Sequence, residues 1–301
     1  MARFRGIYSI AQSPFDEMGG FMWDDFEREV DWIVRAGAHG LVWPVMASEF
    51  TVLSTRERVQ GMKVCVDVVG GRIPVVIGVA DTSKDGAVYL AEQAAAAGAD
   101  SIIAMPPWAT HMNRNHLFED YYLALAATVN PMPVMIQNCG PPLGSSLPGK
   151  FVVELCAKID NVSYLKEEKP PQGHAISEVM ELAGPEVLGV FSGAGCKWIF
   201  TEYKRGVCGN MPSSMFTDID AQIWNLLEEG KEAEARTIHN TRLILENALT
   251  SMPARAARKT VMVRRGVFSV AGGRNQLDEL DDIDRAEIDY AYALLEPYFT
   301  V

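Results

Sequence analysis

The residues best suited to chemistry are a lysine and a glutamate at the end of one short apolar stretch, residues 162–168. If this stretch is a strand, Lys166 and Glu168 point to one side and Glu167 to the other, because side chains alternate along a strand. Burial removes the hydration of an ammonium group and favours the neutral amine, which attacks carbonyl carbons. The stretch therefore predicts a nucleophilic lysine or, as the simpler alternative, a strand end whose lysine reaches solvent beside a glutamate.

The stretch belongs to a series of eight short apolar segments that alternate with helical ones. This alternation predicts repeated βα units around a parallel sheet, and eight strands are enough to close a barrel. Helices are predicted between them, for example over residues 23–36 and over 84–97, where Gly98 ends the helix. The predicted strands are residues 6–11, 40–45, 74–80, 101–106, 133–139, 162–168, 187–193 and 206–211.

Beyond about Asp218 the pattern predicts helices alone, over residues 219–229, 231–249, 254–264 and 283–295. We predict a catalytic barrel over residues 1–218 and, packed on it, a C-terminal helical extension over residues 219–301. Active sites of such barrels lie at the carboxyl ends of the strands. That rule selects Ser48 and Glu49 after the second strand, Gln137 and Asn138 in the fifth, and the turn 193–195 after the seventh.

Composition excludes several classes of function. Of 301 residues, 48% are hydrophobic and 22% charged, and no apolar run is long enough to cross a bilayer. The start of the chain has no signal-peptide pattern, so we expect a cytoplasmic protein with no membrane role.

A net charge of −12, with no basic cluster on one predicted face, disfavours nucleic acid as a partner. Five cysteines and five histidines lack metal-site spacing, so we predict no metal and no organic cofactor.

Seven short motifs in order give the chain a family resemblance over nearly its full length. It resembles the superfamily of dihydrodipicolinate synthase and N-acetylneuraminate lyase, the class I Schiff-base aldolases. The resemblance implies a (β/α)8 TIM barrel, Lys166 as the Schiff-base lysine, a small 2-keto acid substrate, and a homodimer or homotetramer. The motifs are Ser13-Pro14-Phe15, Leu53-Ser54-Thr55-Arg56-Glu57-Arg58, Pro74-Val75-Val76-Ile77-Gly78-Val79, Met105-Pro106-Pro107, Tyr164-Leu165-Lys166, Phe191-Ser192-Gly193 and Gly206-Val207-Cys208-Gly209. After the second strand, residues 45–49 stand where the family has a different motif.

Departures from the family pattern bear on the reaction. The family's two threonines after the second strand are absent, so Ser48 and the backbone N–H groups around Ala47 are expected to bind the substrate carboxylate. Gln137 stands where the family's acid–base tyrosine is expected. A glutamine cannot transfer protons, so we predict that Glu168 does so and that Gln137 orients the substrate. Residues 139–144 contain no arginine to hold a second carboxylate, which argues against lysine biosynthesis.

The remaining site residues follow from the resemblance too. Asn138, Gly193 and Met211 are expected to contact the substrate. The whole pattern is most similar to the 2-keto-3-deoxy-L-arabonate dehydratase branch, which implies a hydro-lyase acting on a 2-keto-3-deoxy sugar acid. Two alternatives stay open: a class I aldolase or synthase that uses pyruvate, and a barrel that binds a keto acid without turnover.

Overall fold

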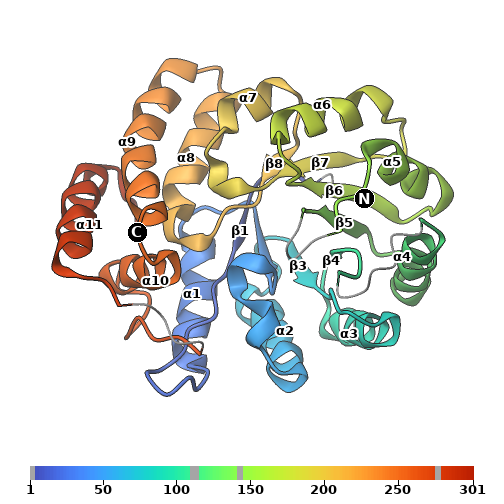
Figure 1. Ribbon diagram of the computed structural model, residues 1–301, viewed down its shortest axis with the longest axis horizontal. Coiled ribbons are helices and arrows are strands. Elements are labelled where there is room, and N and C mark those ends of the chain that lie inside the picture. The colour runs from blue at the N-terminus through green and yellow to red at the C-terminus, as the bar shows by residue number, and fades with distance from the viewer. Residues whose placement is uncertain (1–3, 109–114, 141–144, 275–278) are drawn as a thin grey trace.

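The computed structural model describes residues 4–108, 115–140, 145–274 and 279–301. Its eight parallel strands pair in chain order, and β8 pairs with β1 to close the barrel (Figure 1). The predicted (β/α)8 TIM barrel is therefore confirmed, with strands shorter than predicted. The strands are β1 Gly6–Ile10, β2 Gly40–Trp43, β3 Val75–Gly78, β4 Ser101–Ala104, β5 Val134–Asn138, β6 Val162–Glu167, β7 Gly189–Ser192 and β8 Gly209–Asn210.

The helices follow the predicted ranges closely. Local signals fix several ends: Ser54 caps α2 through a reciprocal hydrogen-bonded box with Glu57, and Gly98 ends α3 with a φ of 90°. The helices are α1 Trp23–Arg35, α2 Thr55–Val69, α3 Lys84–Ala97, α4 Asn115–Val129, α5 Gly149–Lys158, α6 Gln172–Leu182, α7 Ile199–Lys204, α8 Thr217–Glu228, α9 Glu232–Thr250, α10 Ala254–Arg264 and α11 Asp282–Leu295. Short 3-10 turns include η1 Met46–Ser48 and η3 Ala194–Cys196.

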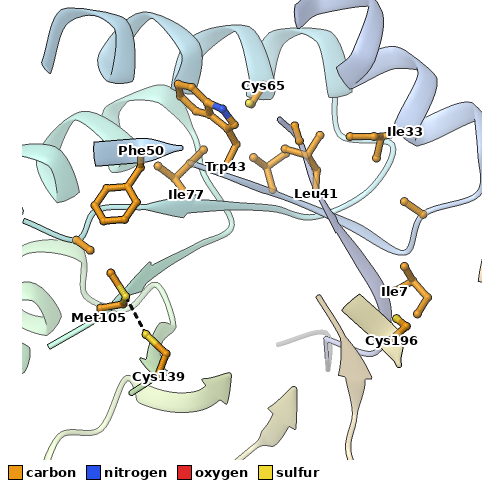
Figure 2. Close-up of a cluster of buried hydrophobic side chains, with 14 of the residues drawn as sticks. Ile7, Ile33, Leu41, Trp43, Phe50, Cys65, Ile77, Met105, Cys139 and Cys196 are labelled. Atoms are coloured by element: carbon orange, nitrogen blue, oxygen red, sulfur yellow. Dashed lines mark hydrogen bonds between the residues drawn. The ribbon is translucent and has the colours of Figure 1, made fainter. Parts of the chain in front are cut away.

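The alternation of side chains divides the apolar residues into two layers. One layer fills the barrel and includes Val76 and Tyr164. The other lies between strands and helices and includes Trp43, Leu41 and Ile77, as Figure 2 shows. In the same outer layer the Cys139 thiol contacts the Met105 thioether, 3.1 Å from sulfur to sulfur. Each strand thus buries both faces, as expected for a parallel sheet.

Helix α8 closes the ring of helices around the barrel, because Thr217 at its start contacts Ser9 of β1, with 2.6 Å between the hydroxyl oxygens. Helices α9, α10 and α11 lie together beyond it on one side (Figure 1). The predicted domain boundary at residue 218 falls in the first turn of α8 and stays a prediction. None of the described helices is both long and apolar enough to cross a membrane.

Candidate active site

Three side chains meet on the inner face of the barrel at the end of β6, and we call them the inner cluster: Gln137, Lys166 and Glu168. Gln137 and Lys166 are paired neighbours in the register of β5 and β6. Lys166 lies two residues beyond Tyr164, which faces the barrel interior, so its side chain points inward as well. Lys166 is only 2% exposed, and its Nζ lies 3.1 Å from Glu168 Oε2. The same oxygen accepts a hydrogen bond of 2.8 Å from Gln137 Nε2.

The carboxylate of Glu168 fits because Gly193 has no side chain. A Cβ at Gly193 would lie 2.1 Å from Glu168 Oε1 and 2.6 Å from its carboxyl carbon. The predicted residues Lys166, Glu168, Gln137 and Gly193 are therefore brought together. A buried amine beside a carboxylate is an arrangement that can attack a carbonyl and then move protons on the bound substrate.

The turn after β2 presents two of its three residues to the site. Met46 and Ala47 line the cavity above Lys166, whereas Ser48 is fully buried behind them. The Ser48 hydroxyl donates to the Ala11 carbonyl at 2.6 Å and accepts from the Val45 N–H at 3.2 Å. The structure thus does not bring the Ser48 hydroxyl to the cavity, and its expected contact with substrate stays a prediction.

Asn138 and Glu167 face the outside of the barrel. The Asn138 amide donates to Glu167 Oε2 at 2.8 Å, and it both donates to and accepts from the backbone of Leu147. Burial raises the pKa of Glu167 to about 7. These bonds fasten the chain that follows β5, so Asn138 supports the site from behind. Residues 141–144, within the stretch whose lack of arginine was noted above, lie outside the described residues.

Above the inner cluster lies a cavity of about 370 Å³, within the usual range for small-molecule sites. Met211 of the predicted set lines it, together with Ile10, Ala194 and Gly195. Its rim also includes residues that sequence reasoning missed. We call these the mouth cluster: Lys197, Arg242, Glu246, Arg255 and Arg258.

The mouth cluster comes mainly from the C-terminal helices. Arg242 and Glu246 lie on α9, while Arg255 and Arg258 lie on α10. A signal was present, because residues 254–265 carry five cations and no carboxylate in a chain of net charge −12. These cations do not share one face, because Arg255 and Arg258 line the cavity whereas Arg264 pairs with Asp289 on α11.

Two other kinds of site find no support in the geometry of the described residues. No group of three or more His, Cys, Asp or Glu side chains among them is arranged to hold a metal ion. Burial raises the pKa of the Cys139 thiol to about 12, which leaves little thiolate for nucleophilic attack.

The closed parallel barrel, with polar side chains gathered at the carboxyl ends of its strands, defines a TIM-barrel enzyme. Residues 3–291 match the Dihydrodipicolinate synthetase family, and the chain belongs to this family. It is therefore an enzyme, a lyase, and the family resemblance inferred from the motifs is confirmed.

Curated relatives in this family differ in reaction. The chain is 26% identical over 289 residues to L-2-keto-3-deoxyarabonate dehydratase of Azospirillum brasilense, covering 95% of this chain and 93% of the relative. It is 29% identical over 266 residues to a probable 2-dehydro-3-deoxy-D-pentonate aldolase of Escherichia coli, covering 87% and 85%. It is 27% identical over 266 residues to 4-hydroxy-tetrahydrodipicolinate synthase of Bacillus subtilis, covering 88% and 90%.

Solved structures share the fold. Dihydrodipicolinate synthase from Rhodopseudomonas palustris superposes with a TM-score of 0.87 at 21% identity, covering 97% of each chain. A protein from Clostridium difficile, CdNal, solved in complex with mannosamine, gives a TM-score of 0.86 at 20% identity, covering 99% of this chain and 100% of the other. At this level of identity the likeness establishes the barrel and its C-terminal helices.

Proposed function

We propose that the protein is a hydro-lyase that removes water from a 2-keto-3-deoxy sugar acid through an imine on Lys166. The observation that carries the proposal is the inner cluster, in which a buried amine and a carboxylate lie 3.1 Å apart beneath an open cavity. The similarity to L-2-keto-3-deoxyarabonate dehydratase supports dehydration over the other reactions of the family.

The first step joins the substrate to the enzyme. Lys166 gives up one proton to solvent as its amine attacks the C2 carbonyl, and the carbinolamine takes up one proton from solvent as it loses water, which leaves a protonated imine. This imine withdraws electrons from C3 and makes its hydrogen acidic. Glu168 is placed to act next, because its carboxylate already lies within hydrogen-bond distance of the lysine nitrogen.

In the second step Glu168 carries one proton from C3 to the C4 hydroxyl. Glu168 removes the C3 proton, which leaves an enamine, and then donates that proton to the C4 hydroxyl, which departs as water. Hydrolysis of the resulting unsaturated imine frees Lys166, so the substrate loses one water overall. The Gln137 amide donates to the Glu168 carboxylate at 2.8 Å, and we propose that Gln137 orients the substrate beside it.

The substrate's own carboxylate, at C1, is proposed to bind at the turn after β2. The first N–H groups of a helical turn have no acceptor within the turn, and those of Met46 and Ala47 occupy this position in η1. Met211 and the backbone at Gly193 complete the surroundings of the reacting carbons. Asn138 supports this site indirectly through the chain after β5.

The aldolase reaction is the second candidate, because the relative from Escherichia coli is slightly more similar and its name describes an aldolase. An aldolase would use the same imine but would remove a proton from the C4 hydroxyl and break the C3–C4 bond. The third interpretation, a barrel that binds a keto acid without turnover, disagrees with membership in a family of lyases.

The test is a panel of 2-keto-3-deoxy acids of five and six carbons, with products identified by mass spectrometry. The proposal predicts products lighter than their substrates by one water, with no pyruvate. Release of pyruvate would mean that the protein is an aldolase and not a dehydratase.

Three further expectations remain predictions: a cytoplasmic location, the absence of a nucleic acid partner, and a homodimer or homotetramer. Light scattering would measure the oligomeric state.

A further inference from the structure

The mouth cluster carries an excess of positive charge that its own residues do not neutralise. Five cations, Lys166 included, line the cavity with two carboxylates, although the chain as a whole is strongly acidic. Glu246 alone faces three of these cations: Lys197 at 3.4 Å and Arg242 and Arg258 at 3.7 Å each. Asp220 pairs with Arg242 as well, so two carboxylates face these three cations and one positive charge is left for an anionic ligand.

The contacts within the mouth cluster are also loose. Arg255 lies 3.5 Å from Glu49, whose second oxygen is held by Lys259 at 2.9 Å. Among the described residues, Arg242 Nη1 and Arg258 Nε are buried atoms without a hydrogen-bond partner. A buried guanidinium N–H that lacks an acceptor costs free energy, and this cost is recovered when a ligand supplies the acceptor.

Arg242 is nevertheless firmly placed. Its residue is 1% exposed, its Nε donates to Asp220 at 2.7 Å, and its Nη2 donates to the Gly195 carbonyl at 2.7 Å. The guanidinium also lies over the Phe216 ring, 4.7 Å from the centroid. The guanidinium of Arg242, a residue that lines the cavity, is thus held with no freedom to turn away.

We propose that the mouth cluster binds a second carboxylate at the far end of the substrate chain, so that the preferred substrate is a keto-deoxy diacid. Arg255 and Arg258 take this carboxylate, with Arg242 as the fixed donor behind them. This inference rests on the proposed function, because it assumes that the near end of the same molecule is the keto group bound at Lys166. Guanidinium groups suit the task, since they bind carboxylates through paired N–H bonds.

The test compares two five-carbon keto acids that differ at the far end alone: 2-oxoglutarate, which ends in a carboxylate, and 2-oxopentanoate, which ends in a methyl group. Each is titrated against the protein with borohydride, and the concentration that gives half-maximal reduced adduct on Lys166 is measured. We expect this concentration to be at least about 10-fold lower for 2-oxoglutarate, the scale of one hydrogen bond to a charged group.

Variants locate the preference. Arg258→Gln and, separately, the half-exposed Arg255→Gln should each reduce the preference for 2-oxoglutarate several-fold and leave 2-oxopentanoate unchanged. The matched control is Arg264→Gln on the same helix, where the side chain pairs with Asp289 and does not line the cavity. This control should keep the full preference.

Two results would overturn the inference. One is equal half-maximal concentrations for the two acids in the unaltered protein. The other is an equal weakening of both acids by the arginine variants, which would mean that the arginines hold the C1 carboxylate common to both.

Calorimetric titration with the same two acids separates this inference from the proposed function. If neither acid is trapped on Lys166, the proposed imine is wrong. A calorimetric preference for 2-oxoglutarate that Arg258→Gln removes would then still support the carboxylate site, and equal binding of both acids would refute it.

Discussion

The inner cluster and the mouth cluster are both charged and both line one cavity, yet they are built differently. The inner cluster stands on adjacent strands, and its contacts are 2.8 and 3.1 Å long. The ion pairs of the mouth cluster around Glu246 are 3.4 to 3.7 Å long and come mainly from helices outside the barrel ring. Strand register thus fixes the inner cluster, whereas longer contacts, mainly between helices, hold the mouth cluster around Glu246.

The largest effect should follow removal of the proton-transfer group from the inner cluster. Glu168→Gln keeps the shape and some hydrogen bonding but cannot move a proton, so we expect turnover to fall roughly 10²–10⁴-fold. Trapping of keto acid on Lys166 should persist. Gln137→Ala, the comparison variant, should lose much less. Normal turnover by Glu168→Gln, or loss of trapping along with turnover, would contradict the assignment.

A smaller effect is expected from displacing the same carboxylate without changing it. The new methyl group of Gly193→Ala would meet Glu168 Oε1, which must move, so turnover should fall about 10-fold or more. Thermal stability should change little, because the end of a flexible side chain can shift. The control is Gly140→Ala, where a Cβ meets no atom of the described residues within 4 Å. Equal activity of the two variants would show that the position of Glu168 is not critical.

Glu29 should make the free energy of unfolding depend on pH. Glu29 of α1 accepts hydrogen bonds from the Gln12 N–H and the Ser214 hydroxyl, and burial raises its pKa from 4.5 to about 8. The folded protein therefore keeps a proton that the unfolded chain releases above pH 4.5. The contribution of Glu29 to the free energy of unfolding is fully present below pH 4.5. It declines as the pH rises to about 8 and is then constant.

The variant Glu29→Gln removes this titration, so its free energy of unfolding relative to the unaltered protein should rise by roughly 3 kcal/mol between pH 5 and pH 8. Urea unfolding at both pH values measures the change. Glu27→Gln, on the exposed side of the same helix, is the control. A pH-independent difference between Glu29→Gln and the unaltered protein would show that Glu29 is ionised in the fold.

The smallest effect is expected at Ser48, in the turn after β2. Ser48→Ala deletes a buried donor to Ala11 and an acceptor for Val45, so the free energy of unfolding should drop by about 1 kcal/mol. The direct contact with substrate expected from the sequence predicts instead a loss in kcat/KM with unchanged stability. Chemical unfolding and kinetics on the same variant distinguish these outcomes.

The barrel and the inner cluster were predictable because they depend on local patterns. Strand periodicity placed Lys166 and Glu168 on one side, and parallel pairing brought Gln137 beside them. Ser48 and Asn138 were harder to place, because both side chains bond to nearby backbone in preference to facing the cavity. The mouth cluster depends on how α9 and α10 pack against the barrel, and a rule that searches strand ends alone does not reach them.

The proposed mechanism depends on an imine between Lys166 and the substrate. Borohydride reduction in the presence of pyruvate or a 2-keto-3-deoxy acid, followed by peptide mass spectrometry, tests it directly. We expect the peptide carrying Lys166 to gain the mass of the reduced ligand and the Lys166→Ala variant to gain none. An unmodified protein, or a label on another lysine, would contradict it.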